Sequence, residues 1–243
     1  MSYYPTENLS LNISRGLVKG TSYVHKFGAV DAMSQNVSGT IWDVDDALYP
    51  WQRFAPGPLV LIVEAADSGD IEKSITIEGL DENYNLISEV VTTDSNPVPT
   101  ATTTAQFTRV FRAYVTDTVF ADDVNIKRDG HIVARIRVGN AQTLMAIYTI
   151  PVGYEGFYMQ QQSSVQAGGD CEINTFLRYD GEAEFRVAHS VELTGSGGPY
   201  VYSFHTPLRL PPKTDIDIRG SMRSNNARAT AAFDLILIKQ GLA

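Results

Sequence analysis

The sequence contains a single cysteine, Cys171, among its 243 residues. One cysteine cannot form a disulfide within the chain, and a structural zinc site needs further thiol or imidazole ligands beside it. Cys171 begins the segment Cys171-Glu172-Ile173-Asn174, which we expect to be a β-strand. The residue is therefore expected to act as a small buried hydrophobe.

Long hydrophobic runs are also absent. No segment approaches the ~20 consecutive apolar residues that a membrane-spanning helix needs. The first residues, Met1-Ser2-Tyr3-Tyr4-Pro5, lack the basic and then apolar pattern of a secretory signal. We therefore expect a soluble protein that is made in a cytoplasm and has no membrane partner.

Positive charge is scarce, because 19 Lys and Arg residues stand against 28 Asp and Glu residues, for a formal net charge of −9. An acidic surface repels the phosphate backbone of nucleic acids, so direct nucleic-acid binding is disfavoured. The simplest interpretation of the acidity is that it keeps the protein soluble.

Motifs that carry chemistry are missing as well. The four histidines stand in unrelated local settings, and the chain has no His-Glu-X-X-His, no Gly-X-Ser-X-Gly and no phosphate-binding loop. The acidic run Asp43-Val44-Asp45-Asp46 does not fit a calcium loop, because Ala47 stands where a fifth-position ligand is needed. We expect no enzyme, no cofactor and no metal. An irregular calcium site near Asp43, Asp45 and Asp46 and a hydrolase on a β scaffold remain alternatives.

What the chain does contain is strand alternation. Asp215-Ile216-Asp217-Ile218-Arg219 alternates strictly, and Ser74–Glu78 with Leu86–Thr92 predicts a hairpin around turn residues such as Asp81. About seven strands are expected after residue 139, separated by Gly, Pro, Asn or Asp. The pattern predicts an all-β fold of antiparallel β-sandwich or jelly-roll units, two in number.

The organisation along the chain suggests three parts. Residues 1–36 are weakly patterned and are expected to form an N-terminal arm. Residues 37–139 are expected to form an N-terminal β domain, and residues 140–243 a C-terminal β-sandwich or jelly-roll domain. The joint between the two domains is expected at Gly139-Asn140.

Four aromatic residues, Trp42, Tyr49, Trp51 and Phe54, bracket the acidic run. Large aromatic side chains are typical anchors of protein interfaces, so we take these four as the candidate interface. Two alternatives are that they fold the loop onto itself as a small core, and that they stack on a sugar.

Several sequence segments resemble those of a known group of proteins. They are Gly39-Thr40-Ile41-Trp42-Asp43-Val44, Tyr49-Pro50-Trp51, Ile75 to Asn85 with Ile87-Ser88-Glu89, Phe107 to Ala113, and Ile147 to Gly156. On these segments the chain resembles structural proteins of tailed bacteriophages, especially those of marine and cyanobacterial phages. The resemblance covers about residues 37–160 and extends more loosely to the rest.

The resemblance implies a virion protein that is made in the bacterial host cytoplasm and binds other virion proteins, such as major capsid or tail proteins. Within that class we expect a capsid decoration or cement protein, or a head–tail or tail component, because the long repetitive shaft of a fibre is missing. A homo-oligomer is expected, with a trimer favoured. The alternative is a receptor- or carbohydrate-binding module of a tail fibre or appendage.

Overall fold

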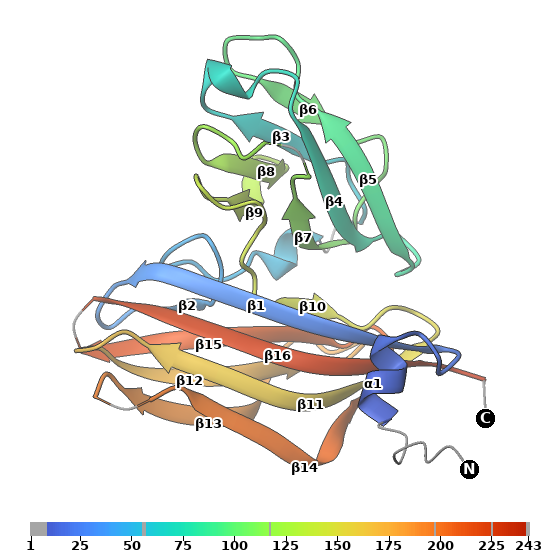
Figure 1. The fold of residues 1–243 in the computed structure, drawn as a ribbon, viewed down its shortest axis with the longest axis vertical. Coiled ribbons are helices and arrows are strands. Elements are labelled where there is room, and N and C mark those ends of the chain that lie inside the picture. The colour runs from blue at the N-terminus through green and yellow to red at the C-terminus, as the bar shows by residue number, and fades with distance from the viewer. Residues whose placement is uncertain (1–8, 55–56, 117, 197, 225, 242–243) are drawn as a thin grey trace, which may run out of the picture.

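The computed structural model describes residues 9–54, 57–116, 118–196, 198–224 and 226–241 (Figure 1). Apart from the short helix α1 (Leu9–Ser14) and two 3-10 turns (Trp51–Phe54 and Ser68–Asp70), the regular elements are strands. These strands are β1 (Thr21–Met33), β2 (Ser38–Thr40), β3 (Ile62–Ala65), β4 (Ser74–Leu80), β5 (Leu86–Thr92), β6 (Thr100–Thr102), β7 (Arg109–Tyr114), β8 (Val124–Arg128), β9 (His131–Ile136), β10 (Ile147–Thr149), β11 (Tyr154–Val165), β12 (Asp170–Arg178), β13 (Arg186–Thr194), β14 (Tyr200–Leu210), β15 (Asp215–Ser224) and β16 (Ala227–Lys239). The expected all-β class is confirmed.

The strands form four antiparallel sheets. Two are built mainly from the second half of the chain, in the orders β1-β16-β11-β14 and β10-β15-β12-β13, with β2 added to β15. The other two come from the middle of the chain, in the orders β6-β3-β8-β9 and β5-β4-β7. In Figure 1 the first two sheets lie in the lower part of the molecule and the other two form a separate body above them.

Each of these two bodies has its own hydrophobic core. The upper core draws its fully buried side chains from Trp42 to Ile147, whereas the lower core takes most of its members from 30–41 and 146–237. The chain therefore begins in the lower body, builds the upper body, and returns. This differs from the expected division at Gly139-Asn140, because the upper core extends to Ile147 and the lower body uses both ends of the described chain.

The N-terminal arm expected over residues 1–36 is not what the structure has over its described part. Residues Thr21–Met33 form β1, which pairs with β16 over most of its length. The sequence pattern did not predict this strand, because its buried positions do not alternate and because Gly28 interrupts it. Gly28 is needed there, since a Cβ atom at this position would lie 2.2 Å from the carbonyl oxygen of Ile41.

The hairpin predicted from residues 74–92 is confirmed as β4 and β5. Its turn is closed by Asp81, whose Oδ1 accepts hydrogen bonds from the backbone N–H groups of Asn83 and Asn85, each at 2.8 Å. This is the side-chain-to-backbone bonding that favours Asp and Asn in turns.

Among the described residues, no helix has the length and apolar character to cross a membrane.

Candidate functional site

The four aromatic residues singled out in the sequence come together in one cluster. Trp42 follows β2 and forms an isolated bridge with Met145, while Trp51 and Phe54 lie at the two ends of a 3-10 turn. Tyr49 is the centre, with its ring centroid 5.1 Å from that of Trp42, 4.8 Å from that of Trp51 and 6.0 Å from that of Phe54. These distances are typical of edge-on and stacked aromatic packing.

All four rings are buried inside the chain itself. Their exposed fractions are 1% for Trp42, 2% for Tyr49, 5% for Trp51 and 3% for Phe54. A side chain that anchors a partner or stacks on a sugar must present a free face. The cluster offers none, so its geometry matches the small-core alternative. In the free chain these residues are not available to a partner.

Each polar ring atom in the cluster has a hydrogen-bond acceptor. The indole N–H of Trp42 donates to the Ala47 carbonyl, and the Tyr49 hydroxyl donates to the Val110 carbonyl, both at 2.9 Å. The indole N–H of Trp51 donates to Asp217 Oδ2 at 2.9 Å. This last bond connects the upper body to β15 of the lower body.

Asp217 is one of two buried aspartates on β15. The isoleucines of Asp215-Ile216-Asp217-Ile218 face the lower core, and the aspartates face the opposite side of the strand. The sequence predicted this alternation, but a carboxylate face is normally a solvent face. Here the upper body covers it.

Asp215 carries the densest set of contacts. Its carboxylate accepts from Arg109 at 2.9 and 3.1 Å, and from Arg178 at 3.1 and 2.6 Å. The hydroxyl of Thr149 donates to the same carboxylate at 2.6 Å. Arg109 comes from β7 in the upper body and Arg178 from β12 in the lower body. The buried Arg109–Asp215 pair therefore joins the two bodies.

Asp217 is satisfied in a similar way. Besides Trp51, it accepts from the guanidinium of Arg219 and the hydroxyl of Thr40, each at 2.8 Å. We name Arg109, Trp51, Arg178, Asp215 and Asp217 the joint cluster, because these side chains meet where the two bodies touch.

Aromatic rings complete the surroundings of Arg109. Its guanidinium lies 5.5 Å from the ring centroid of Trp51, 5.8 Å from that of Phe54 and 5.4 Å from that of Tyr84. Burial by itself lowers the pKa of Arg109, but the Asp215 carboxylate outweighs it and raises this pKa above its usual value. The cation is held charged beside the Asp215 carboxylate.

The acidic loop before the cluster is held by one arginine. Arg137 pairs with Asp45 at 2.8 Å and Asp31 at 3.3 Å, and its Nε lies 3.8 Å from Asp43 Oδ1. Asp46 instead accepts the backbone N–H of Ser34 at 2.8 Å. Within the described ranges, no group of three or more His, Cys, Asp or Glu side chains is arranged to hold a metal ion. Of the three aspartates in the irregular calcium alternative, Asp43 and Asp45 face Arg137 and Asp46 faces Ser34.

Asp43 is the buried member of this loop. Its Oδ2 accepts a hydrogen bond from the backbone N–H of Leu144, while its Oδ1 has no hydrogen-bond partner among the described residues. Burial, more than any other influence, raises the pKa of Asp43 from 3.8 to about 8. The folded protein therefore holds this carboxyl as a neutral acid near neutral pH.

We expect this carboxyl to make stability depend on pH. Because the folded pKa of Asp43 lies above its unfolded value, its contribution to stability is fully present below pH 3.8 and is lost as pH rises towards 8. Asp43→Asn keeps the shape of the neutral acid and removes the titration. In urea unfolding, the unfolding free energy of the variant should rise relative to that of the wild type by a few kcal/mol between about pH 5 and about pH 9. A difference that stays constant across this range would contradict the assignment.

A second aromatic group was missed in the sequence. Tyr200, Tyr202 and Phe204 alternate along β14, and His189 lies beside them on β13. The His189 ring centroid lies 4.8 Å from that of Tyr202, and its Nε2 lies 3.2 Å from the Tyr200 hydroxyl. Burial lowers the pKa of His189. We name these four residues the aromatic strip. The period-two run Tyr200-Val201-Tyr202-Ser203-Phe204 was the signal that could have revealed it.

The aromatic strip differs from the first cluster because it reaches the surface. Tyr202 is 39% exposed, and Tyr200, Phe204 and His189 are half-buried. Since β13 and β14 are the last strands of their two sheets, the strip lies where those sheets have no further neighbour. It is an aromatic surface that a partner could reach, as are the exposed rings of Tyr23 and Phe27 on β1.

Comparison with known proteins adds little to this description. No model of a protein family matches the chain, and no curated protein matches it. Among solved structures, the chain is similar to one titled "Crystal structure of infectious bursal disease virus VP2 subviral particle", with 6% sequence identity over 92% of this chain and 73% of that chain. The TM-score is 0.22, which carries no argument about fold or function.

Proposed function

We propose that this chain is a structural protein of a tailed-bacteriophage virion, and that it acts through contacts between subunits without catalysing a reaction. The observation that carries the proposal is the way in which the strands of the lower body pair. The resemblance of segments such as Gly39–Val44 and Tyr49–Trp51 to phage structural proteins supports the same assignment.

Eight strands of the lower body, taken in chain order, pair from the outside inwards. β1 pairs with β16, β10 with β15, β11 with β14, and β12 with β13. The chain is thus one long antiparallel hairpin. Further pairing of β11 with β16 and of β12 with β15 divides it into two four-stranded sheets. We propose that this arrangement is a jelly roll, a fold that viral capsid proteins and lectins share.

The upper body fits a role in assembly. It is inserted between β1 and β10, the first two strands of the proposed roll, and is fastened by the joint cluster. Two connections and a buried ion pair give a two-part block with a defined shape. Such a block suits a capsid decoration or cement protein, or a head–tail or tail component.

The aromatic strip is the surface that we assign to subunit contacts. Tyrosine is enriched at the energetically important positions of interfaces, since it combines a large apolar face with a hydrogen-bonding tip. We favour a trimer, a closed ring in which the strip of each subunit contacts a different surface of the next subunit.

The proposal is tested by mass spectrometry of purified phage particles. The protein should be present in a fixed ratio to the major capsid protein. A ratio near that of the capsid protein would identify a decoration or cement protein, and a much lower ratio set by a ring would identify a head–tail or tail component. Absence from the particles would reject the structural assignment.

The aromatic strip also supports a second candidate function, a receptor- or carbohydrate-binding module. Lectins share the jelly-roll fold, and an exposed tyrosine ring can stack on a sugar. A glycan array separates the two candidates. Binding that is lost in Tyr202→Ser would favour the carbohydrate module, and an array without signal would reject it.

A further inference from the structure

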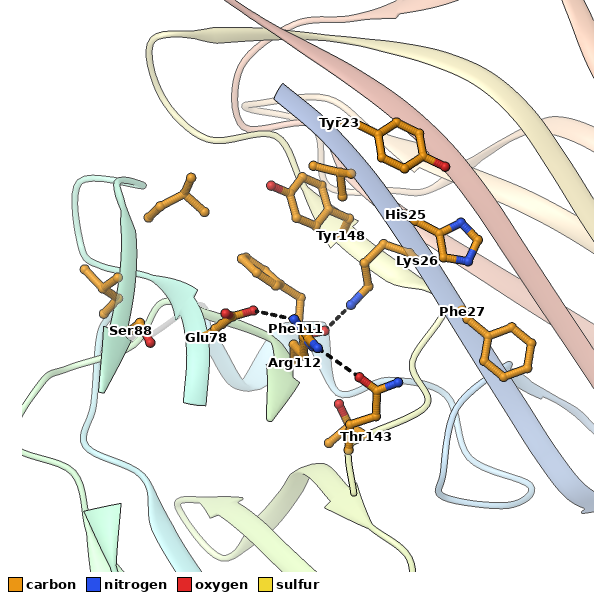
Figure 2. Close-up of a pocket in the computed structure, with 14 residues that line it drawn as sticks. Tyr23, His25, Lys26, Phe27, Glu78, Ser88, Phe111, Arg112, Thr143 and Tyr148 are labelled. Carbon is orange, nitrogen blue, oxygen red and sulfur yellow. Dashed lines mark hydrogen bonds and ion pairs between the residues drawn. The ribbon is translucent and has the colours of Figure 1, made fainter. Parts of the chain in front are cut away.

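A cleft of about 650 Å³ lies between the two bodies, and its lining includes no residue of the joint cluster (Figure 2). One wall is the run Tyr23–Phe27 of β1, which is the outermost strand of its sheet. The opposite wall is the outer face of the sheet β5-β4-β7, where Ser88, Glu78 and Arg112 lie side by side in register. The volume is in the range of small-molecule sites.

Lys26 extends from β1 into this cleft. It is the one lysine of the described residues that is buried, with 8% of its surface exposed. Its ammonium group donates to the carbonyl of Phe111 and lies 5.7 Å from the centroid of that ring. Figure 2 shows the side chain pointing across the cleft towards Phe111 and Arg112.

The Glu78 carboxylate is close enough to act on the charge of Lys26, but it does not form an ion pair with it. Within the described part of the chain, no carboxylate forms an ion pair with Lys26. Glu78, the acid on the facing strand, pairs with Arg112 at 3.7 Å. Burial, followed by the positive charge of Arg112, lowers the pKa of Lys26 to about 7. A buried charge without a counter-ion is costly, and an anion placed beside it relieves that cost.

The remaining lining determines what kind of anion would fit. Arg112 supplies a second cation, held in place by Gln142 Oε1 at 3.0 Å. Apolar and aromatic walls come from Val24, Leu86, Ile87, Phe111 and Tyr148. Since Glu78 already balances Arg112, the two cations and this one carboxylate leave a single positive charge among apolar walls. That arrangement is complementary to a small molecule with one acidic group and an apolar body.

We propose that this cleft binds a small carboxylate with an aromatic or branched apolar body, whose acid group pairs with Lys26 and Arg112. The acid is the counter-ion that Lys26 lacks, and the ring or branched chain lies against Phe111 and Tyr148. Because both bodies contribute to the walls, the bound carboxylate would hold them together. This site is separate from the subunit contacts proposed above, and each proposal can fail without the other.

Binding should also take up a proton. Near neutral pH part of Lys26 is unprotonated, and an adjacent carboxylate favours the charged form of the amine. The other titratable or charged groups of the cleft are Tyr23 and His25 on β1, Glu78 on β4, Arg112 on β7 and Tyr148 on β10. His25 already has an acidic neighbour, because its Nδ1 lies 2.7 Å from Asp234 Oδ1. We therefore do not assign it a contact with the ligand.

The test is isothermal titration of the full chain with hydrocinnamate, compared with hydrocinnamyl alcohol, which has the same body without the acid. We expect saturable binding of the acid, much weaker binding of the alcohol, and a heat that varies with the ionisation enthalpy of the buffer, as proton uptake requires. Lys26→Met should weaken binding of the acid by about tenfold or more, equivalent to about 1.4 kcal/mol.

Two further variants make the result decisive. Lys239→Met removes an exposed lysine on β16 and should leave binding unchanged. Arg112→Gln provides a second disruption of the site if Lys26→Met fails to fold, which its melting curve would reveal. Equal binding of acid and alcohol, unchanged binding in both cleft variants, or no saturable binding of the acid at millimolar concentration would overturn the proposal.

Discussion

Asp215→Ala should cost about 3–5 kcal/mol of unfolding free energy, because it leaves a buried cation without its counter-ion. Arg109 would remain enclosed by aromatic rings without a carboxylate beside its Nε. The substitution also removes the acceptor of the buried Thr149 hydroxyl and one of the bonds that join the two bodies. Urea unfolding followed by tryptophan fluorescence measures the loss, since Trp51 lies beside Arg109.

A matched control is available on the surface. Arg186 and Glu182 form an ion pair of the same length as Arg178 and Asp215, 2.6 Å, but the Arg186 side chain is 69% exposed. Glu182→Ala should therefore change stability by less than about 1 kcal/mol. If Asp215→Ala were no more harmful than Glu182→Ala, the joint cluster would not hold the two bodies together.

Trp51→Ala should be comparably destabilising, at about 3–5 kcal/mol, because it opens a cavity where both bodies meet. Trp51→Phe separates the two contributions of this residue. It keeps an aromatic ring in the cluster but removes the N–H that donates to Asp217, so we expect a smaller loss of about 1.5–3 kcal/mol. Because both variants lack the Trp51 fluorophore, urea unfolding followed by circular dichroism compares all three proteins.

This result distinguishes the structure from the first interpretation of the aromatic loop. If Trp51 were an exposed anchor for a partner, Trp51→Ala would leave the isolated chain stable and reduce its incorporation into particles. Full stability of Trp51→Ala would therefore contradict the buried position that the structure assigns to this ring.

The sequence predicted the strand Asp215–Arg219 but not the role of its acidic face. Alternation along one strand shows which side chains share a face, but not what covers that face. Arg109, which covers Asp215, is 106 residues away along the chain. Long-range pairing of this kind leaves no periodic signal in the sequence.

Strand β1 was not predicted from the sequence for a different reason. β1 is buried irregularly because part of it lines the cleft and part passes close to Ile41 at Gly28. Its sequence therefore lacks the period-two pattern that made the β4–β5 hairpin easy to predict. Phe111 is a related case. A bulge places it as an extra residue opposite the Glu78/Gly79 step, and it packs on Tyr148 of the other body at 4.7 Å.

The aromatic cluster was found from composition and position, while its burial could be given only as one of three alternatives. Aromatic residues around a loop are compatible with an interface, a sugar site or a small core, because all three need large apolar rings. The distances around Tyr49 and the ring exposures favour the core. The aromatic strip, by contrast, reaches the surface with Tyr202 and can contact a partner.

We propose that this chain is an assembled part of a phage particle, built as a jelly roll with an inserted second body. A cryo-EM reconstruction of the particle tests it most directly. We expect density for both bodies at symmetry-related positions on the capsid, neck or tail, with the β13–β14 edge at a subunit contact. A particle map in which every protein density is explained by other chains would contradict it.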